Sequence, residues 1–134
     1  MEITALAAAS FFGGEGDAGT VSVLTERGRA VQARLLAGEA ERLAWAVEVL
    51  AECQADVPPL LHGSQREAFA RSLAEGEVAA TLGVGLAGAG DLLDLAERLT
   101  TVMPSVLTAL GEGRIDVPRV RALVEATSVL DDDL

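Results

Sequence analysis

Three arginines near the carboxyl end, Arg114, Arg119 and Arg121, form a local concentration of positive charge. Guanidinium groups are common partners of phosphate oxygens, so this cluster is the candidate for contact with nucleic acid. Arg119 and Arg121 are two positions apart, however, and on a helix such positions point to different sides. The alternative interpretation is solvated charge, or pairing with the nearby Glu112 and Glu125.

Residue types that catalyse reactions or bind metals are scarce. His62 is the sole histidine, whereas a metal site needs further ligands, and Ser64 is too near in sequence for a typical nucleophile relay. Cys53 is the single cysteine, which excludes an intrachain disulfide, and its acidic neighbours favour a buried or merely tolerated thiol over a reactive one. The acidic run at 131–133 is typical of a wet helix end, with weak divalent-ion binding as the alternative. We expect no catalytic residue, no cofactor and no metal site.

The stretch "EGEVAATLGVGLAGAGDLLDLAERL", residues 75–99, has the outline of a helix, a tight turn and a second helix. Ala79 and Gly83 have the spacing of the small residues that let the helices of a helix-turn-helix unit cross closely. The stretch from Gly85 to Asp94 contains no Arg, Lys, Asn, Gln, Ser or Thr to donate hydrogen bonds to bases or phosphates. We therefore predict a packing unit rather than a DNA reader. Its expected small core is Val78, Leu82, Val84 and Leu92.

Composition favours one all-α domain. The chain has 134 residues, half of them apolar, but only one Trp and three Phe, so the core must be built from Leu, Val and Ala. The formal net charge is −11 and every cation is an arginine. Such an acidic chain has no general attraction to nucleic acid or to anionic membranes.

The amino end lacks the features of a secretion signal. Glu2 stands where a signal peptide needs positive charge, and no stretch approaches the roughly 20 apolar residues that cross a bilayer. A single cysteine also suits a reducing compartment. We expect a soluble cytoplasmic protein that does not bind membranes.

Glycines and prolines divide the chain into expected elements. "GGEGDAGT", residues 13–20, predicts a flexible link, so residues 1–24 are expected to be weakly ordered and residues 25–134 to form the helical domain. The first helix is predicted from about Thr25 to Gln54, with Gly38 as a place to bend or break and Pro58 ending it. Its predicted buried stripe is Leu36, Ala40, Leu43, Val47 and Leu50.

The second half predicts several shorter helices. Ser64 and Glu67 have the spacing of a capping box before a short helix through Phe69 and Leu73, and the chain is expected to re-set near Gly76. Helices over 78–82 and 86–101 follow, the second with Leu92, Leu95, Ala96 and Leu99 inward. Two proline-led helices, over 103–110 and 117–124, close the chain, with Asp116 capping the last. The result is a compact bundle of about five to six short helices.

The order of motifs over residues 65–134 resembles the actinobacterial family called domain of unknown function 222, which commonly precedes an HNH endonuclease domain. The resemblance runs through "EVA" at 77–79, "LAERL" at 95–99, Pro104, "LGEGRI" at 110–115 and "EATSVLDD" at 125–132. Family members often have several arginines after the turn, where this chain has "GLAGAGDLLDLA". They also continue past the "LDDD" motif, whereas this chain stops at Leu134, so no HNH residue can be carried over.

The resemblance and the composition together predict a non-catalytic accessory module that acts through protein contacts, including self-association. The alternative is a DNA-binding module that supports a nuclease, with Arg114, Arg119 and Arg121 as the contacts. We do not expect the chain to cut DNA by itself.

Overall fold

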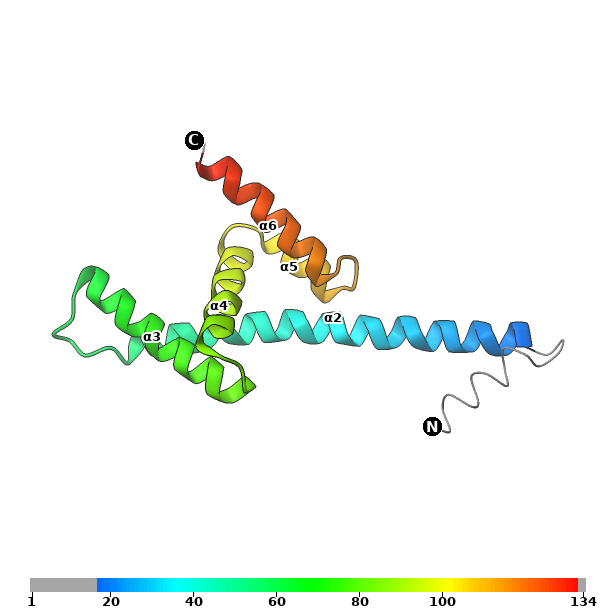
Figure 1. Cartoon of the computed structure of the whole chain (residues 1–134), viewed down its shortest axis with the longest axis horizontal. Coiled ribbons are helices and arrows are strands. Elements are labelled where there is room, and N and C mark those ends of the chain that lie inside the picture. Colours follow the sequence, from blue (N-terminus) through cyan, green and yellow to red (C-terminus); the bar gives the residue numbers. More distant parts are fainter. Residues whose placement is uncertain (1–16, 133–134) are drawn as a thin grey trace. The chain divides into compact units, whose positions relative to one another are not determined.

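The computed structural model describes residues 17–132. Within that range the chain contains no strand, and its five helices are α2 (Asp17–Ala55), α3 (Gly63–Leu82), α4 (Leu86–Thr101), α5 (Pro104–Gly111) and α6 (Val117–Asp132) (Figure 1). The all-α prediction is confirmed, although α2, with 39 residues, is not short. The chain divides into two compact units between Leu35 and Leu36, within α2.

The first unit, where it is described, is the amino-terminal part of α2. The helix begins at Asp17 rather than near Thr25, so the predicted flexible link is wrong for residues 17–20. Residues 1–16 of the expected weakly ordered segment lie outside the described residues. A helix that has already formed adds a residue at little cost, which explains how it extends through Gly19 and Gly28. Every side chain from Gly19 to Leu35 is exposed.

The second unit has a core of small and branched aliphatic side chains. Leu36, Leu43 and Leu50 of α2 are buried, while Ala40 and Val47 pack half-buried against the same core. The predicted stripe is therefore confirmed. The helix passes through Gly38 without interruption and ends at Ala55, before the two prolines. Leu93, Leu99, Leu110 and Val120 bring α4, α5 and α6 into the same core.

Helix α3 differs from its prediction in two ways. It is one continuous helix through Gly76. Gly76 costs about 1 kcal/mol relative to Ala, but the buried face made by Ala70, Ala74 and Val78 continues across it. The helix also starts at Gly63, with His62 as an N-cap that makes no side-chain hydrogen bond, so the predicted capping box is wrong.

The last three helices follow the predicted turns. Helix α4 spans the residues predicted for it, and Gly83 before it adopts a left-handed φ of 66°, which glycine allows without strain. Gly113, with φ 75°, lies in the turn between α5 and α6. The Asp116 carboxylate accepts a hydrogen bond of 3.0 Å from the Arg119 amide, as an N-cap should. Helix α6 runs to Asp132, beyond the predicted end at residue 124.

Candidate functional site

Helices α3 and α4 meet in the geometry of a helix-turn-helix unit. Their axes are bent by 110° across the turn, and the Val84 amide donates to the Ala79 carbonyl at 3.1 Å (Figure 1). Val78 is fully buried, and Leu82 and Leu92 pack half-buried against the core, as predicted. Val84 is 42% exposed, so its predicted place in the small core is wrong. Its side chain lies instead beside the first turn of α4, about 4 Å from where a Cβ on Gly88 would stand.

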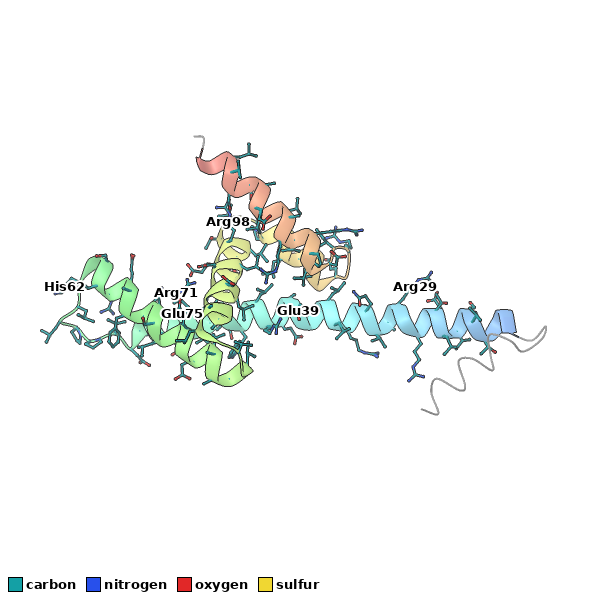
Figure 2. The ribbon with its side chains drawn as sticks, viewed as in Figure 1. Arg29, Glu39, His62, Arg71, Glu75 and Arg98 are labelled. Carbon is teal, nitrogen blue, oxygen red and sulfur yellow. The ribbon has the colours of Figure 1, made fainter. Side chains whose placement is uncertain are left out.

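The second helix of this unit is held by its acidic residues. Arg71 of α3 donates from Nη2 to Asp94 at 2.5 Å and from Nη1 to Glu97 at 2.5 Å, both on α4. It also donates to the Gly90 carbonyl at 2.9 Å and, from Nε, to Glu75 at 3.2 Å (Figure 2). The carboxylates of Asp94 and Glu97 thus join α4 to α3. This four-partner contact, the Arg71 clamp, is not evident from sequence spacing.

The clamp also keeps the Arg71 guanidinium charged. Burial alone lowers the pKa of Arg71, but the hydrogen bonds and charge of Asp94, the hydrogen bond to Glu75 and the charge of Glu97 outweigh burial and raise it. Each of the three guanidinium nitrogens donates to an acceptor on the protein. Arg71 therefore serves packing between α3 and α4, and is not available to a phosphate ligand.

The three arginines predicted as candidate nucleic-acid contacts differ in their surroundings. Arg114 donates to Glu112 at 2.7 Å, the pairing considered in the sequence. Arg119 and Arg121 are both exposed on α6, on either side of the buried Val120. Arg121 lines a groove of about 360 Å³ between α4 and α6, whose other charged groups are Arg98 and the carboxylates of Asp91, Asp94 and Glu125. A phosphate at Arg121 would meet these carboxylates.

The residues with catalytic or metal-binding chemistry remain apart. His62 is exposed at the start of α3, and no group of three or more His, Cys, Asp or Glu side chains within residues 17–132 is arranged to hold a metal ion. Cys53 is buried, as predicted, and burial raises the pKa of its thiol, with the charges of Glu77, Asp56 and Glu52 adding to the effect. Helix α6 includes Asp131 and Asp132 in its last turn, and Asp133 lies outside the described residues.

A second groove, between α2 and α3, was not anticipated from the sequence. It has a volume of about 480 Å³. It is lined by Trp45, Glu48, Val49, Glu52, Cys53, Asp56, Leu73 and Glu77. The signal in the sequence is the row of acidic residues four apart at 48, 52 and 56, because like charges at this spacing repel and destabilise a helix. Because this acidic row lowers the stability of the helix, it is a candidate for a functional role.

Comparison with known proteins gives no match. No family model, no curated protein and no solved structure is similar to this chain. The resemblance to the domain of unknown function 222 family therefore rests on the residues quoted for it. No single helix within residues 17–132 is long and apolar enough to cross a membrane; only α3 and α4 together reach that composition, across their 110° bend.

Proposed function

We propose that this chain is a non-catalytic helical interaction module, similar to the accessory region that precedes HNH endonuclease domains, and that it pairs with a second copy of itself. The observation that carries the proposal is a row of exposed apolar side chains on the first unit. Val21, Leu24, Val31 and Leu35 form this row, and they are between 40% and 61% exposed. Contiguous exposed apolar side chains on a small domain commonly mark an interaction surface.

The spacing of the row suits pairing between two helices. Its members, together with Gly28, alternate steps of three and four, which is the seven-residue repeat that keeps one seam of a helix facing a partner helix. No atom lies within 4 Å of the place where a Cβ would stand on Gly28. A second helix can approach closely at that point, so the glycine does not interrupt the seam.

The charges beside the row select the direction of pairing. Arg27 and Arg34 flank the row on one side, and Thr25 and Gln32 flank it on the other. Neither arginine forms an ion pair with another described residue. In a parallel pair, Arg27 lies near Gln32 of the second copy, a favourable contact. In an antiparallel pair the arginines of the two copies face each other and repel. We therefore assign a parallel pair.

Light scattering across a concentration series tests the proposal. Val31→Asp/Leu35→Asp should weaken association roughly a hundredfold, since each buried Val or Leu contributes about 1.5 kcal/mol or more. The matched control, Ala30→Asp/Ala33→Asp, adds the same charge away from the row and should leave association largely intact. A strict monomer at high micromolar concentration, or equal weakening by both double variants, would contradict the proposal.

A further inference from the structure

The groove between α2 and α3, within the second unit, combines an apolar floor with an acidic rim. Trp45, Val49 and Cys53 lie four residues apart along α2 and form one side of the floor, and Leu73 of α3 forms the other. Phe69, one turn before Leu73 on α3, is 39% exposed, as is Leu73 itself. Two of the four aromatic residues thus stand at or beside one groove. Large aromatic side chains on a surface are typical of the centre of a protein interface.

The acidic side chains of the rim have no ion-pair partner among the described residues. Glu48 and Glu52 lie one turn apart on α2, Asp56 directly follows the end of that helix, and Glu77 lines the groove from α3. None of the four forms an ion pair or a hydrogen bond with another described side chain, and no arginine lines the groove. By contrast, the carboxylates on the other face of α3, near Arg71, are paired. Unpaired like charges repel one another, and an external cation would relieve that repulsion.

The shape of the rim distinguishes between kinds of cation. The described carboxylates do not converge in any group of three that would hold a metal ion. Those at 48, 52 and 56 follow the end of α2 in a row instead, over about 12 Å at 1.5 Å per residue. A groove between two helices, apolar along its floor and charged along its edge, matches the surfaces that receive an amphipathic helix. Nucleic acid and anionic lipid carry the wrong charge for this rim.

From the floor, the rim and the length of the groove, we infer that this surface binds a basic amphipathic helix of a protein partner. The apolar face of that helix covers Trp45, Val49 and Leu73, and its lysines or arginines pair with the carboxylates of the rim. Trp45 adds the electron-rich face of an indole ring, which attracts cations. This binding surface goes beyond self-association through the first unit and does not depend on it.

The groove contains its own reporter, because Trp45 is the only tryptophan and the chain has no tyrosine. The probe is a synthetic helix about 18 residues long, built from Leu on one face and Lys on the other. Titration should shift Trp45 emission to shorter wavelength and give a saturable Kd that weakens with salt. Two further peptides serve as comparisons. In the first, Glu replaces Lys, so the apolar face is kept and the charge is reversed. In the second, Gln replaces Leu, so the positive charge is kept and the apolar face is lost. Neither of these two peptides should shift the emission wavelength of Trp45.

Matched variants distinguish peptide binding at the groove from a general attraction of the peptide to the negatively charged chain. Glu52→Gln/Glu77→Gln should weaken binding about five- to tenfold, whereas Glu67→Gln/Glu125→Gln, with the same change in charge away from the groove, should weaken it less than about twofold. Leu73→Gln should weaken binding, and Leu60→Gln, at an exposed site outside the groove, should not. Equal effects of the two charge variants, or an unchanged Trp45 spectrum at saturating Leu–Lys peptide, would overturn the inference.

The same titration on Val31→Asp/Leu35→Asp keeps the two proposals distinct. If the groove binds the probe independently, this variant should retain the wild-type Kd even where it no longer self-associates. A loss of peptide binding in this variant would show that the inferred surface is not independent, and would contradict the inference as stated. A monomeric wild-type chain that binds the probe would contradict only the proposed self-association.

Discussion

The two parts of α2 have apolar residues at the same spacing but in different surroundings. In residues 36–55, the steps of three and four place Leu43 and Leu50 in a core shared with α3 to α6. In residues 19–35, the same spacing leaves Val31 and Leu35 exposed. Periodicity identifies which face of a helix is apolar, whereas its burial depends on residues elsewhere in the chain or in a partner. One helix therefore contributes to the core at one end and leaves an apolar face exposed at the other.

The largest expected difference between the two units comes from truncating one leucine in each. Leu99 is 0% exposed and Leu35 is 61% exposed. Leu99→Ala should lower the free energy of unfolding by about 2–5 kcal/mol, because it removes buried surface and leaves a cavity. Leu35→Ala should change it by less than about 0.5 kcal/mol at concentrations below self-association. Urea denaturation followed by circular dichroism measures both. Similar losses would mean that the first unit has a core of its own.

Removal of an arginine from each unit sharpens the contrast. Arg71→Ala leaves Asp94 and Glu97 without their contact between α3 and α4, and should lower the unfolding free energy by about 1–2 kcal/mol. Arg29→Ala removes only an exposed pair with Glu26 within one helix, and should cost less than about 0.5 kcal/mol. Arg71→Lys should recover only part of the loss, because an ammonium cannot reproduce the planar set of donors. Denaturant titration of all three variants in low and high salt provides the measurement.

The smallest effects are expected at two glycines. Gly76 in α3 and Gly28 in α2 both have open space where a Cβ would stand. Gly76→Ala should raise the unfolding free energy of the second unit by about 0.5–1 kcal/mol. Gly28→Ala should slow amide hydrogen exchange in its own part of α2. It should not raise the free energy of global unfolding, since the first unit has no buried side chain among residues 19–35. A global gain from Gly28→Ala would argue against this separation of the units.

Much of the fold follows from local patterns in the sequence, and the errors have a common cause. Helix α4 and the turn at Gly83 were predicted closely, because a proline-free amphipathic run and a glycine in a left-handed turn are local signals. The predicted break at Gly76 was wrong because burial of Ala74 and Val78 on either side outweighs the intrinsic cost of glycine. The helix at residues 17–20 was missed for a similar reason. Composition alone does not show that a neighbouring helix extends through a glycine-rich stretch.

The candidate sites depend on contacts that no local pattern contains. Arg71 meets Asp94 and Glu97 across more than twenty positions of sequence, a pairing set by the 110° crossing of α3 and α4. The α2–α3 groove likewise needs Leu73 to face Trp45 from another helix. Sequence periodicity included neither Glu48 nor Glu52 in the predicted buried stripe, and both are exposed. It did not indicate that they border an apolar surface with no cation among its lining residues.

The Arg71 clamp has a consequence for the variation expected among related sequences. One guanidinium satisfies three carboxylates and the Gly90 carbonyl, so replacing Arg71 by a neutral residue leaves several negative charges close together. Homologues that lose the arginine should therefore also lose acidic residues at the positions of Glu75, Asp94 and Glu97. Any side chain at the position of Gly90 would meet Glu75, whose Oε1 lies 3.3 Å from where its Cβ would be. These five positions should change together as lineages diverge, even where the surrounding helices vary freely.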